Sequence, residues 1–513
     1  MNFIATHLLS TILFFPAFSA LVMLFLPRDE AKLHKWFAFG ASLIPFALSL
    51  YAWFNFRMSQ TGYQFEEMYT WYTAIGSSLH LGVDGLSLSM VLLTTLLTPL
   101  AILASFSISD RTKAYMMLFL FLETGMLGVF LAVDLLIFFV FWEVGLVPMY
   151  FLINQWGSAN RNYASLKFMI YTMGGSLGLL LAVQLLGVLF KTYDLQYITA
   201  NWSAYTGSIA GISAGTFKTI AFWAFVIAFA VKVPLWPFHT WLPDAHTEAP
   251  TAGSMILAGV LLKLGAYGFL RLILPLYPTE AKYFAGALAF LAVAAIVFGA
   301  LASYAQTDFK RLVAYSSVNH MGFVVLGIAA AAFAVGTDDA RIALNGAILQ
   351  MFNHGLSAAG MFFLVGVIYE RTHTRNLEEF GGLFPLIPVY GGILIFTSMA
   401  SLGLPGLNGF ISEFLVVRGS FGVGVNSTAS VMVVYTAVAM LGLLFTGAYI
   451  LKGIKKVLHG PLNEHWAHGE HLLTEISARE VVVMVPLMAL ILWIGLYPAW
   501  ILDVINKAVV MLF

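Results

Sequence analysis

The stretch TFKTIAFWAFVIAFAVKVPLWP, residues 216–237, contains the two features that decide this fold. It is a mostly apolar run of about 20 residues, which is the length that an α-helix needs to cross the hydrocarbon core of a bilayer. Its end carries Lys232, followed by Pro234 and Pro237, and proline removes a backbone donor and disrupts a helix. The stretch therefore predicts a membrane-spanning helix that is broken beside a charged group.

The same apolar character extends through the whole chain. Of its 513 residues 60% are hydrophobic and 10% charged, against about 25% charged in soluble domains. A bilayer admits only helices or closed barrels, and these stretches are too long and too uniformly apolar for barrel strands. We predict an all-α polytopic membrane protein with about 14 transmembrane helices. Their expected ranges are 7–26, 34–55, 85–107, 113–132, 134–153, 165–190, 216–236, 252–276, 281–302, 311–335, 342–370, 385–424 (interrupted), 430–454 and 482–506.

Basic residues predict the orientation of the chain. They gather after the first, third, fifth, ninth, eleventh and thirteenth expected helices, for example at Arg28, Lys310 and Arg371, and are sparser in the alternate loops. The positive-inside rule then predicts that both termini lie on the outer side of the membrane. The formal net charge is zero, so the composition indicates no nucleic-acid partner.

A second broken helix predicts an internal repeat. The expected helix 385–424 is interrupted by GLPGLNG, residues 403–409, which includes Pro405 and Gly406. The two broken helices, the seventh and the twelfth, are five apart, which predicts two inverted five-helix repeats, helices 4–8 and 9–13; paired broken helices of this kind indicate a transport path. The alternative is two unrelated kinks. The expected units are helices 1–3 (1–112), the first repeat (113–276), the second repeat (281–456), and a polar cytoplasmic loop with the last helix (457–513).

Six ionisable residues fall within the expected helices. A charge at the centre of a bilayer costs at least about 2.5–3.5 kcal/mol, so six charges need partners or water. One interpretation is a set of buried ion pairs that only holds helices together. Because all six groups bind protons, and histidine does so near neutral pH, we favour a hydrated proton relay without a metal. The six residues are Glu143, Lys232, Lys263, His320, His354 and Glu413.

Three further residues are secondary relay candidates: Glu123, Lys167 and His239. For Lys167 the alternative is a side chain that reaches from the helix to the membrane interface. We expect that interfacial role for Asp134 and Arg271.

The loop after the seventh helix carries His239, Asp244, His246 and Glu248. These residues form either an entry funnel for protons or an ordinary polar turn, and the sequence does not separate the two.

Metal and redox chemistry have little support in this sequence. His465, His468 and His471 recur every third residue and could bind a metal, but a solvated loop is the favoured interpretation. The chain has no cysteine, which excludes thiolate metal sites and cysteine-held iron–sulfur clusters. No glycine pattern for a nucleotide lies in a strand–turn–helix setting. We therefore expect no cofactor in this chain and electron transfer elsewhere.

Long motifs resemble the antiporter-like membrane subunits of respiratory complex I, the proton-pumping NADH:quinone oxidoreductase. The motifs are FWEVGLVPMYFLI (141–153), KVPLWPFHTWLPDAHTEAPTAGS (232–254) with KLGAYG (263–268), and DFKRLVAYSSVNHMG (308–322). The resemblance covers essentially the whole chain. Within the family it is similar to the M (chain 4) type, because LPGLNGFISEF (404–414) carries Glu413 where the sister subunits usually have lysine.

The resemblance implies roles for these residues. Glu143 and Lys232 would form the ion pair of the first half-channel, and Lys263 would be the central relay site. His320 and His354 would continue the relay, and Glu413 would end it on the outer side. Glu123 matches only some members of the family.

The resemblance also implies the surroundings of the chain. It would be a translocase subunit in the bacterial inner membrane, beside other antiporter-like subunits, while NADH, FMN, iron–sulfur clusters and quinone would belong to other subunits. Two related alternatives are a subunit of a multisubunit sodium/proton antiporter, and a membrane subunit of a hydrogenase or a ferredoxin-fed complex. From another class, a purely structural membrane scaffold stays open.

Overall fold

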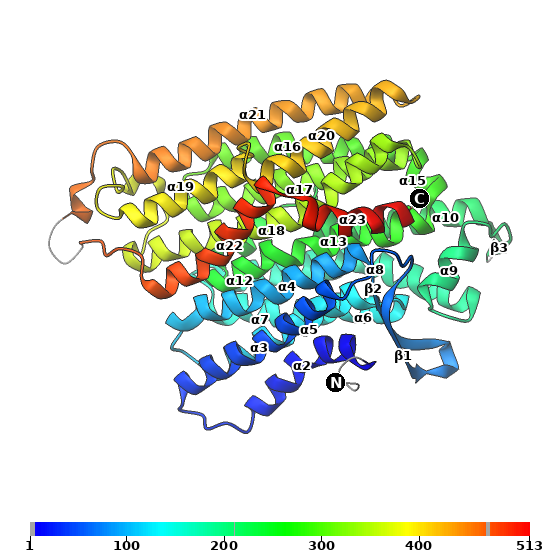
Figure 1. Cartoon of the computed structure of the whole chain (residues 1–513), viewed down its shortest axis with the longest axis horizontal. Helices are drawn as coiled ribbons and strands as arrows, with labels where there is room; N and C mark the ends of the chain where they lie inside the picture. The colour runs from blue at the N-terminus through cyan, green and yellow to red at the C-terminus, as the bar shows by residue number, and fades with distance from the viewer. Residues whose placement is uncertain (1–5, 210, 468–471, 513) are drawn as a thin grey trace.

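A computed structural model describes residues 6–209, 211–467 and 472–512 of the chain. It is a bundle of long helices that run side by side (Figure 1). In the described part, twelve helical segments are long and apolar enough to cross a membrane. They are Ala31–Phe54, Gly85–Ser107, Thr112–Leu131, Leu135–Trp156, Arg161–Phe190, Ala214–Lys232, Thr251–Leu276, Ala285–Ala305, Phe309–Phe333, Asp338–Thr372, Val431–Leu458 and Ala478–Leu496. The prediction of a polytopic helical membrane protein is confirmed.

Two shorter apolar helices, Leu8–Met23 (α2) and Pro388–Leu402 (α19), lie where the first and twelfth helices were expected. Outside the apolar stretches are two small hairpins, which the sequence analysis did not predict. β1 (Gln64–Tyr72) pairs with β2 (Ser77–Val83), and β3 (Ser208–Ile209) pairs with β4 (Ile212–Ser213), both antiparallel. Polar loops outside the bilayer can satisfy their backbone by such pairing.

Both predicted helix breaks are present. Helix α10 (Ala214–Lys232) ends at Lys232, and turns that contain Pro234 and Pro237 lead to α11 (Trp241–Glu248). Helix α19 ends at Leu402 and α20 (Asn408–Asn426) starts after Pro405. Gly403 and Gly406 between them have φ angles of +81° and +95°, a left-handed conformation that glycine adopts without steric cost.

The eighth expected helix is less regular than its sequence suggests. It consists of α12 (Thr251–Ile256), a π-helical segment at Leu257–Leu261, α13 (Leu262–Gly268), a second π-helical segment at Phe269–Ile273 and α14 (Leu274–Leu276). Lys263 thus lies between two π-helical segments, which often mark functional sites. Helix periodicity in the sequence does not reveal them.

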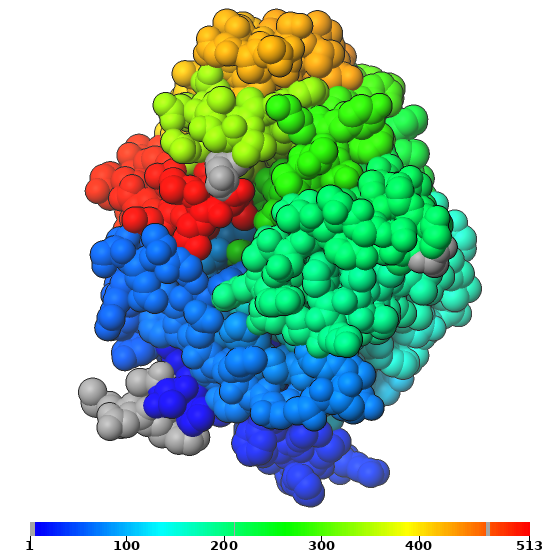
Figure 2. All heavy atoms as spheres, turned by 90° about the vertical axis from the view of Figure 1, so that its right-hand side faces the viewer, coloured from blue at the N-terminus to red at the C-terminus, as the bar shows by residue number. Residues whose placement is uncertain are grey.

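The prediction of one continuous last helix over 482–506 is wrong. Helix α22 (Ala478–Leu496) ends before Pro498, and α23 (Ala499–Met511) follows it. Proline cannot donate the backbone hydrogen bond that would continue the helix. Figure 2 shows one end of the bundle, where the red C-terminal helix lies beside the blue N-terminal region; α23 packs on α4 (Gly85–Ala104), and Gly62 donates its N–H to Met511.

Three of the relay candidates, Lys263, His354 and His320, lie on the most buried helices of the bundle. The segments Gly85–Ser107, Thr251–Leu276 and Asp338–Thr372 (the last being α18) are buried along their apolar length. α17 (Phe309–Phe333) is nearly as enclosed and packs against α18, α20 and α16 (Ala285–Ala305). Helices α3 (Ala31–Phe54), α8 (Arg161–Phe190) and α21 (Val431–Leu458) expose far more of their surface.

Candidate functional site

The centre of the site is a contact between Lys263 and His354. The Lys263 Nζ lies 2.7 Å from His354 Nδ1 and also donates to the carbonyl oxygen of Ala258 at 2.5 Å. Ala258 is five residues before Lys263, within the π-helical segment, so this irregular turn brings an acceptor to the amine. Lys263 is completely buried and His354 is 3% exposed. An amine and an imidazole in hydrogen-bond contact can pass a proton between them.

A second contact joins His320 on α17 to Glu413 on α20. His320 Nδ1 lies 2.8 Å from Glu413 Oε1, and both side chains are 5% exposed. The other ring nitrogen of His320, Nε2, lies 3.1 Å from the hydroxyl of Tyr449 on α21. The Gln350 amide donates to the same Glu413 oxygen at 3.1 Å. Glu413 thus has two defined partners although it lies directly after a helix break.

A narrow gap separates the two pairs. The ring centroids of His320 and His354 are 5.7 Å apart, and His354 Nε2 has no hydrogen-bond partner among the described residues. Both rings line a small cavity with Gln350 and Asn353, and the space open to the centre of a water-sized sphere is about 10 Å³. That is about the space that one water molecule needs, and the lining supplies polar partners for it.

Glu413 also faces outward from this chain. A second pocket of about 260 Å³ reaches Glu413 from the side, between α19, α20 and α21. Its walls include Phe414 and Met440, which are 52% and 45% exposed. The carboxylate therefore lies between the inner cavity and the lateral surface, a position that suits the end of a relay.

The first half of the site differs from the expectation of a direct ion pair. Lys232 is buried, and its Nζ lies 4.4 Å from the centre of the Trp142 ring and 3.5 Å from the Trp142 carbonyl oxygen. No ion pair of 4.0 Å or less joins Lys232 to Glu143 in the described parts of the chain, and Glu143 Oε1 has no partner there. The indole takes the ammonium group by a cation–π contact, which explains the missing direct pair.

The three secondary candidates lie in different environments. Glu123 on α5 (Thr112–Leu131) is completely buried, and neither carboxylate oxygen has a partner among the described residues. Lys167 forms an ion pair with Asp244 at 2.7 Å and so does not simply extend to the interface. His239 is partly buried, with its ring 6.1 Å from that of Tyr315. Within the described ranges, none of the three forms a hydrogen bond or ion pair with Lys263 or His354.

The interfacial role expected for Asp134 and Arg271 is wrong. Asp134 is 1% exposed, and its carboxylate accepts from the N–H groups of Leu136 and Ile137 and from Ser77. It caps the N-terminus of α6 (Leu135–Val144), a position that favours an acidic side chain.

Arg271 is 7% exposed and pairs with Asp84 at 2.6 Å. Arg271 lies in the second π-helical segment, Phe269–Ile273, and its guanidinium contacts that buried carboxylate instead of extending to the membrane interface.

The polar residues of the loop after the seventh helix lie in different environments. His246 on α11 is completely buried, stacks on Phe362 at 4.2 Å, and has no hydrogen-bond partner at either ring nitrogen in the part of the chain described. Glu248 instead accepts from the backbone of Asn160, and Asp244 pairs with Lys167 and Arg311. The set is therefore not an ordinary solvated turn, since His246 is buried in the interior.

The three loop histidines cannot be compared as a group. His465 lies in the short 3-10 turn Glu464–Trp466, whereas His468 and His471 lie outside the described residues. In the ranges that the structure describes, no group of three or more His, Cys, Asp or Glu side chains is arranged to hold a metal ion.

Several polar residues of the site were missed by sequence reasoning. Gln350, Asn353 and Ser357 share the cavity with His354. Ser412 links them, since its hydroxyl donates to Gln350 at 2.5 Å and accepts from Asn353 at 3.0 Å. The spacing 350, 353, 354 and 357 puts these residues on one face of a helix, so their pattern was a usable signal.

Comparison with known proteins identifies the family of this chain. Residues 132–449 match the family described as NADH:quinone oxidoreductase/Mrp antiporter, TM. NADH-quinone oxidoreductase subunit M of Rickettsia conorii is 39% identical over 512 residues, covering 98% of each chain.

Two solved structures have the same fold. A chain of respiratory complex I from Thermus thermophilus aligns with a TM-score of 0.83 and 27% identity, covering 98% of this chain and 99% of that one. A chain of the Mrp complex from Dietzia sp. aligns at 0.82 with 23% identity, over 98% of this chain and 52% of that one, which indicates the fold alone. Full-length identity of 39% decides the assignment, and the chain belongs to the NADH-quinone oxidoreductase subunit M family, within the wider family of antiporter-like membrane subunits.

Proposed function

We propose that this chain translocates protons as the antiporter-like M subunit of an NADH:quinone oxidoreductase, through its buried Lys/His/Glu relay. The observation that carries the proposal is the order Lys263, His354, His320 and Glu413, with polar contacts of 2.7 Å and 2.8 Å on either side of a gap of one water. Isolated ion pairs that only hold helices together would not need an unpartnered imidazole nitrogen facing a polar cavity.

The relay moves a proton in four steps. Lys263 as ammonium donates to His354 Nδ1, and the neutral amine is left behind. His354 releases a proton from Nε2 to water in the cavity, which passes it to His320. His320 gives a proton to Glu413, and the carboxylic acid releases it from the lateral pocket. Lys263 then takes a new proton. Each imidazole has received its proton on one ring nitrogen and released one from the other, so its remaining proton returns to the first position, by tautomer exchange or ring rotation, before the next passage.

Glu143 and Lys232 would set the timing of these steps. Helix α13, which carries Lys263, packs closely on the end of α10: a Cβ at Gly265 would lie 2.8 Å from the Phe229 carbonyl oxygen. Two unit charges 4 Å apart interact by about 4 kcal/mol at an effective dielectric constant near 20. A shift of Glu143 toward Lys232 would thus change the charge beside the central lysine, and this is how energy would enter the relay.

His246 is a further candidate for the entry side of the relay. Its unpartnered nitrogens lie in the interior beside Phe362, and its helix follows the broken end of α10. His239 and Lys167, with Glu123, remain secondary candidates for the same input. We include them as groups that exchange protons with the main series.

The proposal includes an architecture. We infer 14 transmembrane helices, with two inverted five-helix repeats formed by helices 4–8 and 9–13, and both termini on the outer face of a bacterial inner membrane. The two helix breaks at matching positions support the repeats. The basic loops support the orientation.

Redox chemistry would take place on other subunits. NADH, FMN, iron–sulfur clusters and quinone would bind there, and the chain would act as a translocase subunit beside neighbouring antiporter-like subunits. The relatives named NADH-quinone oxidoreductase subunit M support this assignment over a sodium/proton antiporter. Electrostatic coupling between adjacent membrane subunits would transmit the energy of quinone reduction.

The relay is tested by Lys263→Gln in the assembled complex. Inverted membrane vesicles should retain quinone reductase activity that responds to uncoupler, while proton uptake per NADH oxidised falls. Lys282→Gln, which changes an exposed lysine outside the site, is the matched control. Unchanged proton uptake in an assembled Lys263→Gln complex would refute the relay. The Lys263→Arg variant separates loss of charge from loss of the 2.7 Å contact.

A further inference from the structure

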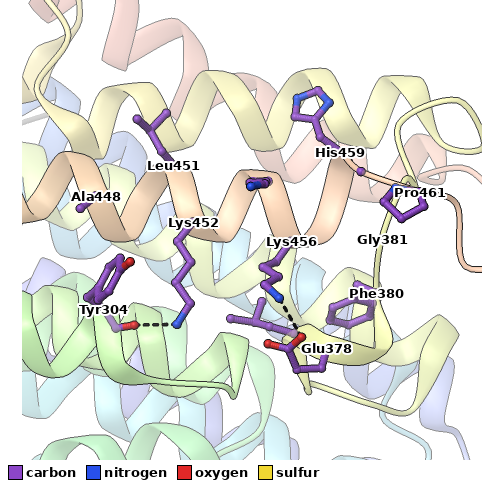
Figure 3. A pocket seen from close by; sticks show the side chains of 13 residues that line it. Tyr304, Glu378, Phe380, Gly381, Ala448, Leu451, Lys452, Lys456, His459 and Pro461 are labelled. Carbon is purple, nitrogen blue, oxygen red and sulfur yellow. Dashed lines mark hydrogen bonds and ion pairs between the residues drawn. The ribbon is translucent and has the colours of Figure 1, made fainter.

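A large pocket lies away from the relay, at one end of α21. It has a volume of about 700 Å³ and lies between the end of α21, Tyr304 at the end of α16, and the segment around Phe380. Figure 3 shows Lys452 extending from α21 toward Tyr304, and Lys456 toward Glu378 in the segment beside Phe380. The size is typical of a ligand site, and none of the relay residues lines it.

The pocket carries excess positive charge. Its lining includes three lysines, Lys452, Lys455 and Lys456, and one acid, Glu378, so the formal net charge is 3 − 1 = +2 with His459 neutral. Lys456 pairs with Glu378 at 2.7 Å. This ion pair holds the pKa of Glu378 below its ordinary value.

Neither of the other two lysines forms an ion pair of 4.0 Å or less with an acidic side chain in the described part of the chain, although Lys452 lies near enough to Glu378 to interact with its charge. Lys452 donates to the carbonyl oxygens of Tyr304 and Gln306 at 2.6 Å and 2.9 Å, and its charge is not neutralised by them. The Lys455 side chain is exposed and takes part in no hydrogen bond or ion pair within the described ranges. Two cationic groups are therefore available to an anion.

An apolar stripe leads from Lys455 along the helix. Leu441, Leu444, Ala448 and Leu451 precede it at spacings of three, four, three and four residues, which is one face of a helix. The three leucines are 51%, 68% and 56% exposed. At a rise of about 1.5 Å per residue the stripe is about 21 Å long. An aliphatic chain that lies along it would end beside the lysines.

The combination identifies one ligand class. We propose that this pocket binds an anionic phospholipid, with the phosphate of its headgroup at Lys452 and Lys455 and an acyl chain along the leucine stripe. Tyr304 lies under Lys452, at 5.2 Å from ring centre to Nζ, as expected for an aromatic residue at the level of the headgroups. Basic pockets between transmembrane helices suit anionic headgroups, whereas a zwitterionic lipid gains less from them.

The test uses the full chain with the subunits with which it assembles, in lipid vesicles. A phosphatidylglycerol with a photoreactive group on one acyl chain is compared with phosphatidylcholine of the same acyl chains. Labelled peptides are then mapped by mass spectrometry. We expect label at Leu444 and Leu451 with the anionic probe, at least about five-fold above the choline probe. One lysine near an anionic headgroup contributes a factor of about five.

Charge variants separate this site from general attraction to the membrane. Lys455→Gln should lower the labelling about five-fold, and Lys455→Arg should retain it. Because Lys455 has no bonding partner in the described structure, its replacement removes no internal contact and leaves the fold intact. Lys113→Gln is the control, since Lys113 also donates to carbonyl oxygens, of Leu24 and Leu26, outside the pocket.

Three results would overturn the proposal. The first is equal labelling by the anionic and choline lipids. The second is displacement of the probe by millimolar inorganic phosphate, which would identify a site for free phosphate. The third is a cross-link from a photoreactive residue at Leu451 to another protein chain without lipid labelling, which would make the pocket a protein interface.

Discussion

The contact between His320 and Glu413 offers the sharpest test of the relay. Glu413→Gln keeps the shape of the side chain and removes its charge at the 2.8 Å contact. Hydrogen bonds to charged groups contribute about 1.5–3 kcal/mol. Since about 1.4 kcal/mol is a factor of ten, the population with a proton on this pair should fall by about 13-fold to 150-fold. Proton transfer through this chain should fall by at least the lower factor.

Tyr449→Phe is the matched comparison. It removes the other partner of the same imidazole, the hydroxyl at 3.1 Å from Nε2, but it changes no charge. A neutral hydrogen bond contributes about 0.5–1.5 kcal/mol, so the expected loss is only about 2-fold to 13-fold.

The assay is proton uptake per NADH oxidised in inverted vesicles, with the amount of assembled complex measured in parallel. Glu413→Gln should lower the ratio by the share that this chain contributes, and Tyr449→Phe should lower it less. Equal losses in the two variants, or a larger loss with Tyr449→Phe, would refute the assignment of Glu413 as a proton-carrying group. A normal ratio with Glu413→Gln would refute it as well.

Two further predictions concern packing and pH. Gly265→Ala should lower the free energy of unfolding by about 1–3 kcal/mol, as overpacking does, because the new Cβ would lie 2.8 Å from the Phe229 carbonyl oxygen. Gly40→Ala should not lower it, because no atom lies within 4 Å of the new Cβ. Equal melting temperatures of the two variants would contradict this prediction. In the β1–β2 hairpin, the hydrogen bond to Asp194 raises the pKa of His80 above 6.5. His80 therefore stabilises the folded chain most below its unfolded pKa, and this stability is lost as pH rises through the folded pKa. The difference in melting temperature between wild type and His80→Gln should shrink over that range, and a constant difference would count against the ion pair.

Long apolar stretches determined much of this protein without any tertiary information. The run at 216–237 predicts both a spanning helix and its break, because a bilayer leaves the backbone no partner except its own helix. The residues 403–409 predict the second break for the same reason, since proline and glycine cannot continue a helix. The six ionisable candidates were also visible in sequence, because charges are rare at that depth.

The contacts among those residues were decided only by the folded structure. Lys263 and His354 are 91 residues apart, and His320 and Glu413 are 93 apart, so no local pattern indicates which of them meet. The π-helical segments around Lys263 and the contact of Lys232 with the Trp142 indole depend on packing between helices. Asp134 and Arg271 were misjudged because a charge near a helix end can reach water or a buried partner, and hydropathy is the same in both cases. The sequence therefore determines which groups lie in the membrane-spanning segments, and tertiary packing decides which of them lie in contact.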